Sequence, residues 1–138
     1  MYKDSVVNGF RKGIITVWKL AKIVVPVYFF VTFLGFTPIL NKISNFFEPV
    51  MKIIGLPGEA SLPLVLGNFI NLYAGLGAMA SLSLTPKQAT ILAIMLSFSH
   101  SLFLETAVAK KVGVSPSVAV LIRIILALLS GITFNLIL

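Results

Sequence analysis

The residues of this chain that could do chemistry are concentrated in one stretch, LSFSHSLFLETAVAKK, residues 96–111. It holds the only histidine, His100, and one of the four acidic residues, Glu105, inside an apolar segment. An ionisable group inside a membrane span marks a functional site by default, because burying it in lipid is expensive. Two plainer readings stay open: an interfacial Glu105 near Lys110, and a His100 that satisfies a backbone carbonyl between helices. The candidate binding residues of this stretch are Ser97, Ser99, His100, Ser101, Glu105 and Thr106.

The spacing of these residues argues against an enzyme. On a continuous helix Ser97, Ser101 and Glu105 are four apart and share a face, without the glycines of a nucleophile elbow. One histidine, one such glutamate and no cysteine are too few for a zinc site, and Gly75-Leu-Gly77 lacks the third glycine of a dinucleotide fingerprint. We therefore expect no catalysis, no resident metal and no cofactor, with a coupling sodium ion or proton as the open alternative.

Composition places these residues in a lipid environment. Of the 138 residues 58% are hydrophobic and 11% are charged, against about 25% charged in a soluble domain. Such a chain, with a mean hydropathy of +1.05, is expected to be an integral membrane protein whose main partner is the lipid bilayer. The net charge of +7 comes from cations that lie mostly at the ends of apolar runs, which favours lipid headgroups over nucleic acid.

Four segments follow from apolar length and periodicity. Residues 5–40 begin with an amphipathic helix and continue into an apolar run of about 27 Å, which predicts a retained membrane helix. Residues 41–54 are too short and too polar to span, and predict an interfacial helix. Residues 86–112 form a long membrane helix interrupted by its polar centre, and residues 114–138 form the last one. Arg123 is placed near the start of that last helix, among the cations of the N-terminal side.

Residues 57–84 predict a re-entrant hairpin. Two half-helices of about ten residues each reach roughly 15 Å, half of a bilayer core, so the segment can turn near the midplane and leave on the same side. The alternative is a straight helix with a small-residue packing face. The residues that break the segment are Asn68 and Asn71, with Gly67, Gly75 and Gly77 expected in the backbone of the hairpin tip.

The order of these elements resembles the nucleoside-recognition or gate-domain family. The resemblance is carried by LPLVLGNFINLYAGLGAMASL and by SHSLFLETAVAKKVGVSP, which is similar to the His-Ser, Glu-Thr-Ala and Lys-Lys pattern of small stand-alone members. The family includes spore maturation membrane proteins and the gate halves of ferrous-iron transporters. Concentrative nucleoside transporters contain the unit twice, in inverted orientation. By position, Asn68 and Asn71 match polar residues of the hairpin tip, and Ser97–Ser101 match the helix break.

The resemblance implies a single half-transporter repeat over residues 1–138: an all-α membrane protein with three spanning helices, an interfacial helix and a re-entrant hairpin. It further implies a multi-pass protein of the prokaryotic inner membrane. A homo-oligomer, such as an inverted dimer, or a pairing with a related gate-domain chain would form a midplane site for a small polar solute or ion. Two alternatives stay open: a non-transporting scaffold or regulator of the spore maturation type, and a metal-ion permease.

Overall fold

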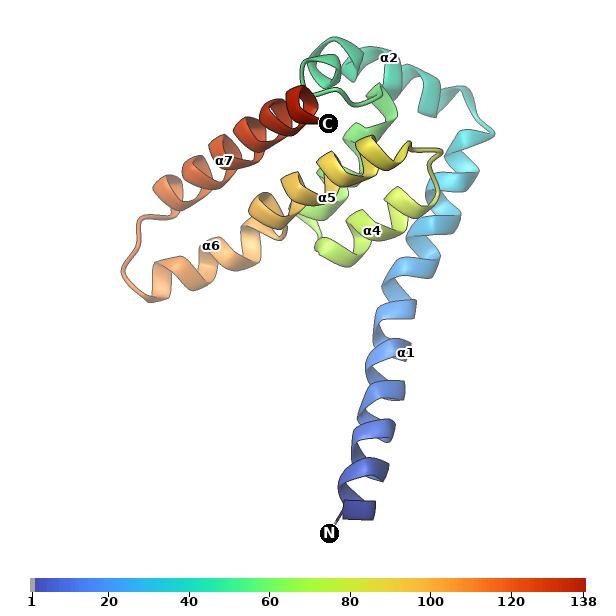
Figure 1. Ribbon diagram of the computed structural model, residues 1–138, viewed down its shortest axis with the longest axis vertical. Helices are drawn as coiled ribbons and strands as arrows, with labels where there is room; N and C mark the ends of the chain where they lie inside the picture. Colours follow the sequence, from blue (N-terminus) through green and yellow to red (C-terminus); the bar gives the residue numbers. More distant parts are fainter. Residues whose placement is uncertain (1) are drawn as a thin grey trace.

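A computed structural model describes residues 2–138, and all the regular structure in that range is helical (Figure 1). Three segments are long and apolar enough to cross a membrane: the first helix, the fifth and sixth together, and the last. The predicted all-α membrane protein with three spanning segments is therefore confirmed. The elements are α1 (Tyr2–Gly35), α2 (Pro38–Ile53), the short 3-10 helix η1 (Gly58–Ala60), α3 (Ser61–Phe69), α4 (Leu72–Ala80), α5 (Pro86–Ser99), α6 (Leu102–Lys111) and α7 (Pro116–Ile137).

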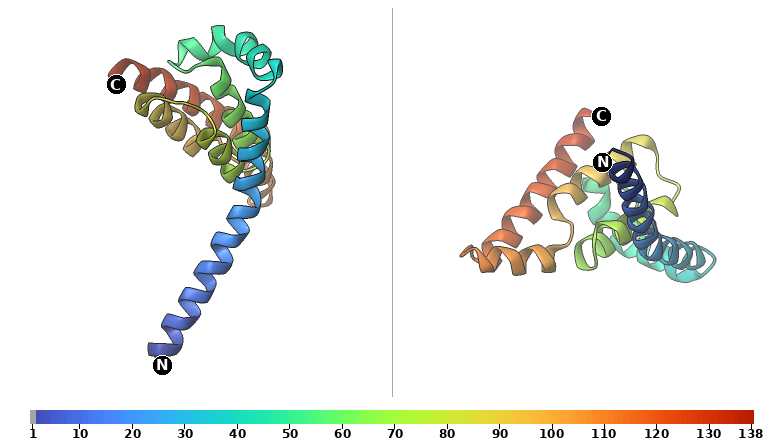
Figure 2. Two further views of the ribbon diagram at one scale, coloured as in Figure 1. Left: turned by 90° about the vertical axis from the view of Figure 1, so that its right-hand side faces the viewer. Right: turned by 90° about the horizontal axis from the view of Figure 1, so that it is seen from below.

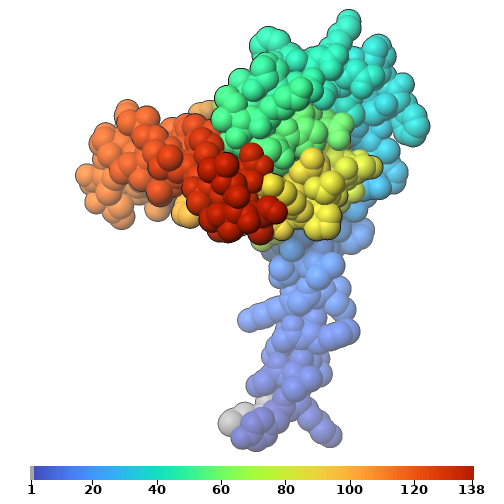
Figure 3. Space-filling model, turned by 45° about the horizontal axis from the view of Figure 1, so that its top comes forward, coloured from blue at the N-terminus to red at the C-terminus, as the bar shows by residue number. Residues whose placement is uncertain are grey.

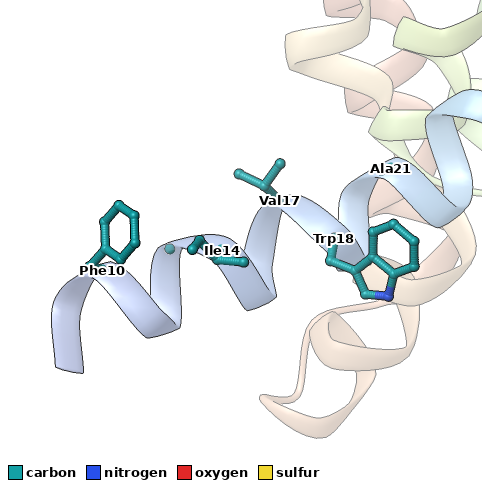
Figure 4. Close-up of a pocket in the computed structure, with 6 residues that line it drawn as sticks. Phe10, Ile14, Val17, Trp18 and Ala21 are labelled. Carbon is teal, nitrogen blue, oxygen red and sulfur yellow. The ribbon is translucent and has the colours of Figure 1, made fainter. Parts of the chain in front are cut away.

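Helix α1 is one continuous helix of 34 residues, about 51 Å long, which exceeds the roughly 30 Å of a bilayer core. Its C-terminal half packs on α4, while its N-terminal half stands away from the rest of the chain (Figures 1 and 3). Phe10, Ile14 and Val17 stand along this free half, which carries the predicted amphipathic pattern (Figure 4). These apolar side chains contact no other element, so lipid must cover them.

Helix α2 lies across the end of the molecule where α1 and α7 finish (Figures 1 and 2). It begins at Pro38, three residues before the predicted start, because Thr37 caps it and Pro38 occupies its first turn. Glu48 and Lys52 form an exposed i,i+4 pair at 2.8 Å on its polar side, and Met51 is buried on the other. The axes of α2 and of the following η1–α3 segment differ by 90°, as expected for an interfacial helix that leads into the hairpin.

Helices α3 and α4 form the predicted helical hairpin. Each has nine residues and is about 14 Å long, so neither can cross the bilayer alone. The chain reverses at Ile70 and Asn71, and the Asn71 side chain caps α4 by accepting a hydrogen bond from the Ala74 amide at 3.0 Å. The straight-helix alternative is therefore wrong, because asparagine favours a cap over a helix interior.

The three glycines do not lie at the tip of this hairpin, and that prediction is wrong. Gly67 and Gly75 lie where the two arms cross: a Cβ atom on Gly75 would be 3.0 Å from the Gly67 Cα. Gly77 faces α1, where a Cβ atom would be 2.8 Å from the Val24 carbonyl oxygen. These residues therefore let helices approach closely, which small residues do in membrane proteins.

The core lies where α5 meets α2, α7 and the hairpin. Helices α5 and α7 run side by side in opposite directions, and Gly131 of α7 faces the Met95 sulfur of α5 (Figure 1). The Lys87 ammonium donates to the Asn135 carbonyl at 2.8 Å, which joins the start of α5 to the end of α7. The central cluster of buried side chains is Met51, Ile54, Leu56, Ala60, Ile91, Leu92, Met95, Leu96 and Ala127.

Membrane re-entry of the hairpin predicts a labelling pattern. The chain has no cysteine, so Lys52→Cys and Ser83→Cys can be introduced together on the two exposed flanks of the hairpin. In sealed vesicles an impermeant thiol reagent should add two labels or none to each molecule, as read by intact-protein mass spectrometry. The control pair Lys52→Cys and Lys110→Cys should always add one label, in either orientation of insertion. Single labelling of the first pair would show that the segment crosses the membrane.

Candidate functional site

The predicted interruption of the third membrane segment lies between α5 and α6, at His100 and Ser101. Side chains compete there for the helical carbonyls: Ser99 Oγ donates to the Met95 carbonyl at 3.0 Å, and His100 Nδ1 lies 2.9 Å from the Leu96 carbonyl. Ser101 then adopts the left-handed conformation, with φ of 52°. Its amide donates to the Gly67 carbonyl of α3 at 2.9 Å, so the break is docked on the hairpin.

This break separates residues that were expected to share one helix face. Ser97 is exposed near the end of α5, where its hydroxyl donates to the Ile94 carbonyl at 2.7 Å. Ser101 is only 8% exposed, and Glu105 belongs to α6 beyond the break. The expectation of a continuous polar face is wrong, because the left-handed residue redirects the chain between these positions.

Arg123 of α7 holds the broken ends together. Its Nε donates to the Phe98 carbonyl at 2.8 Å, and its Nη2 donates to the His100 carbonyl at 2.8 Å. The same Nη2 lies 2.7 Å from Oε2 of Glu105, which forms an ion pair between α7 and α6. The arginine side chain is 19% exposed. A planar guanidinium suits this task, because its fork presents several donors in fixed directions.

His100 and Glu105 are also in direct contact. The ring Nε2 lies 3.2 Å from Glu105 Oε1, while Nδ1 faces the Leu96 carbonyl. Both ring nitrogens thus face oxygen acceptors, and only a doubly protonated imidazole can donate to both. The Glu105 side chain, 44% exposed, is therefore shared between a permanent cation and a ring that can take up a proton. The contacts of the two plainer readings, a partly exposed acid and a ring bonded to a carbonyl, occur within this cluster.

A cavity of about 310 Å³ opens beside the break, between α3, α6 and α7. A neighbouring cavity of about 120 Å³ shares Asn68 and Ile124 with it and reaches Ser99. Asn68 Oδ1 and Thr106 Oγ1 are buried there without a hydrogen-bond partner, and so is Arg123 Nη1. An unsatisfied buried polar group costs about 1–3 kcal/mol, so these atoms favour a polar ligand or water. The larger cavity is lined by Asn68, Phe69, Leu102, Phe103, Thr106, Val120 and Ile124.

The structure gathers most of the sequence-predicted site residues around the break. Asn68, Ser99 and Thr106 line the cavities, while His100, Ser101 and Glu105 form the break and its ion pairs, with Gly67 beneath them. Asn71 lies at the hairpin tip as a cap, and Ser97 does not join the group. Their binding roles stay predictions.

Sequence reasoning missed Arg123 and counted it as a cation of the N-terminal side. It lies more than two turns inside α7 and is bound to the break, so it does not serve as an interfacial charge. A signal was present, because a cation inside an apolar span calls for an intramembrane partner. Glu105 is the only acidic residue in α5, α6 and α7, which makes it the one partner that those helices offer.

Comparisons with known proteins agree with this architecture. The chain is 46% identical over 135 residues to the uncharacterized membrane protein YvoD of Bacillus subtilis, a match that covers 98% of this chain and 43% of that protein. It is 27% identical over 92 residues to the Fe(2+) transporter FeoB of Legionella pneumophila, covering 67% of this chain and 12% of that protein. The chain thus spans less than half the length of these curated relatives. No solved structure matches the chain significantly.

The family assignment rests on a match over most of the chain. The model of the Gate domain, described as nucleoside recognition, matches residues 17–128. This range runs from the second half of α1 into α7 and includes the hairpin, the break and Arg123. The resemblance seen in the sequence is confirmed, and the chain belongs to the nucleoside-recognition Gate family.

Proposed function

We propose that the chain is one half of a membrane transporter, whose site near the bilayer midplane binds a small polar solute or ion. The observation that carries this proposal is the contact between two interrupted elements, the hairpin and the α5–α6 break, through Ser101 and Gly67. Irregular backbone at membrane depth is tolerated only where it is buried in protein or lines a polar cavity. Broken helices of this kind surround substrates in transporters built from inverted repeats.

A second gate unit would complete the site. Glu105 is 44% exposed and Phe103 beside it is 66% exposed, so a lone unit leaves a carboxylate at the surface of its apolar helices. Exposing such a charge to lipid is expensive, and a facing unit would cover it. The match to YvoD leaves more than half of that protein outside, which is room for another unit of this length. A second copy of this chain or a related gate-domain chain would serve the same purpose.

Reconstitution tests this proposal directly. The purified protein in liposomes should produce protein-dependent uptake of one class of small polar solute, measured with labelled candidates against protein-free liposomes. Uptake or binding of none of them would favour the non-transporting scaffold. Fe²⁺ belongs in the same panel because of the likeness to an Fe(2+) transporter. Against a metal-ion permease, residues 2–138 bring together no group of three histidine, cysteine or acidic side chains able to hold a metal ion.

An inverted homodimer predicts dual insertion. Without Arg123, the cations near the membrane ends number five on the N-terminal side (Lys3, Arg11, Lys12, Lys110 and Lys111) against three on the other (Lys42, Lys52 and Lys87). This bias towards a cytoplasmic N-terminus is small, so both orientations are expected. Reporter fusions at Leu138 should give signals from both sides of the membrane in prokaryotic cells. A signal from the outer side alone, with self-association of the purified protein, would exclude the inverted homodimer and favour a parallel one.

A further inference from the structure

We propose that Arg123 is a built-in cation that occupies the cation site of the helix break, so that this site works without sodium. The inference rests on the proposed function and deepens it, because it chooses between a sodium ion and a proton as the coupling ion. It begins with the carbonyl groups at the break. The amides four residues beyond Phe98 and His100 belong to Leu102 and Leu104 of α6, on the far side of the left-handed turn. The two carbonyl oxygens therefore lie at the negative end of α5 and need another donor.

The group that meets this need has the ligand set of a hard cation. Two backbone carbonyl oxygens, of Phe98 and His100, and one carboxylate oxygen of Glu105 converge on the Arg123 guanidinium, at donor–acceptor distances of 2.7–2.8 Å. Hard cations take oxygen ligands of these kinds. In transporters with broken helices, unwound carbonyls and half-helix C-terminal ends coordinate sodium. Here the positive charge at the corresponding place is covalently attached to α7.

A tethered guanidinium excludes a free cation from this place. Arginine stays protonated in proteins, so its charge cannot be removed to make room for sodium. Sodium would have to displace three hydrogen bonds and lie beside a like charge. The groups that face Glu105 are Arg123 from α7 and His100 from the end of α5, and of these the imidazole is the one that can exchange a proton near neutral pH. This leaves the proton as the coupling ion.

Thermal unfolding of the purified full chain in detergent tests the proposal. The wild-type protein is expected to have the same Tm, within about 1 °C, in sodium chloride and in choline chloride, since a ligand that does not bind gives no stabilisation. Arg123→Ala leaves the two carbonyls and the carboxylate without their donor, which should lower Tm by about 5–10 °C. Guanidinium ion at non-denaturing concentration, and to a smaller degree sodium, should restore part of this loss in a saturable manner.

Two matched controls separate site rescue from general salt effects. Arg11→Ala removes the only other arginine, which lies on the exposed half of α1, and should give no response to either ion. Leu92→Ala destabilises the core through a buried side chain that is 0% exposed, and guanidinium should not restore it. Arg123→Lys keeps the charge without the fork, so a smaller Tm loss and no sodium response are expected.

The proposal is overturned if the wild-type protein gains stability from sodium over choline in a saturable manner, a comparison that needs no variant. It is also overturned if guanidinium restores Arg123→Ala no better than Leu92→Ala. If Arg123→Ala does not fold, the wild-type comparison and a sodium-responsive Arg123→Lys still decide against it. These measurements do not depend on transport, so the cation assignment and the transporter proposal can fail separately. In flux assays the corresponding result is uptake that persists when choline replaces sodium.

Discussion

Replacement of Glu105 by glutamine is expected to abolish solute flux in proteoliposomes, while protein yield and oligomer size remain those of the wild type. Glutamine keeps the shape of the side chain and removes the charge that binds Arg123 at 2.7 Å and His100 at 3.2 Å. A hydrogen bond to a charged group contributes about 1.5–3 kcal/mol, so a loss of at least about tenfold in uptake rate is expected. The measurement is initial uptake of the solute identified by reconstitution.

The matched control is Glu48→Gln on α2. Glu48 also pairs with a cation, Lys52, but both side chains are exposed, and such surface pairs contribute little. Its flux should equal that of the wild type. His100→Ala should weaken flux and change its pH dependence, because the imidazole facing Glu105 is the group there that titrates near neutral pH. Unchanged flux in Glu105→Gln would show that Glu105 is an ordinary interfacial acid.

Gly58→Ala is expected to be the most damaging single-methyl change to the fold. A Cβ atom at Gly58 would overlap the backbone carbonyl of Ser44 in α2, and a backbone atom cannot rotate away. The helix α2 and the start of the hairpin would have to separate, at a cost of about 3 kcal/mol or more. The expected result is a Tm lower by about 10 °C in detergent, with reduced yield of monodisperse protein.

The control for this change is Gly13→Ala. Gly13 lies inside α1, and nothing is within 4 Å of the position that an added methyl group would take. Alanine there should be neutral or stabilise the helix by up to about 1 kcal/mol. A wild-type Tm in Gly58→Ala would show that α2 does not pack against the hairpin as described. The same steric contact makes Gly58 unsuitable for a cysteine label, which is why Lys52 is the better position.

The elements of this fold could be predicted because they follow from local lengths and local chemistry. Half-helices on either side of Asn71 were recognisable from the bilayer arithmetic, and the break at Ser101 from clustered hydroxyls. The position of Gly67 and Gly75 could not be predicted, because the point where two arms cross depends on tertiary packing. The same holds for Arg123, since its partners lie 18 to 25 residues away and no periodicity connects them. Hydropathy placed Arg123 near an interface, whereas its three hydrogen-bonded oxygens place it in the site.

The left-handed residue at the break ties two movements together. A non-glycine residue in this conformation costs roughly 1–2 kcal/mol, and Ser101 adopts it with φ of 52°. The hydrogen bond from its own amide to Gly67 offsets that cost only while α3 stays in place. Withdrawal of the hairpin would leave a strained residue and an unpaired amide together, and straightening of α5 and α6 would relieve both. By thermodynamic linkage each event favours the other, so hairpin and break behave as one cooperative two-state unit rather than as two independent hinges.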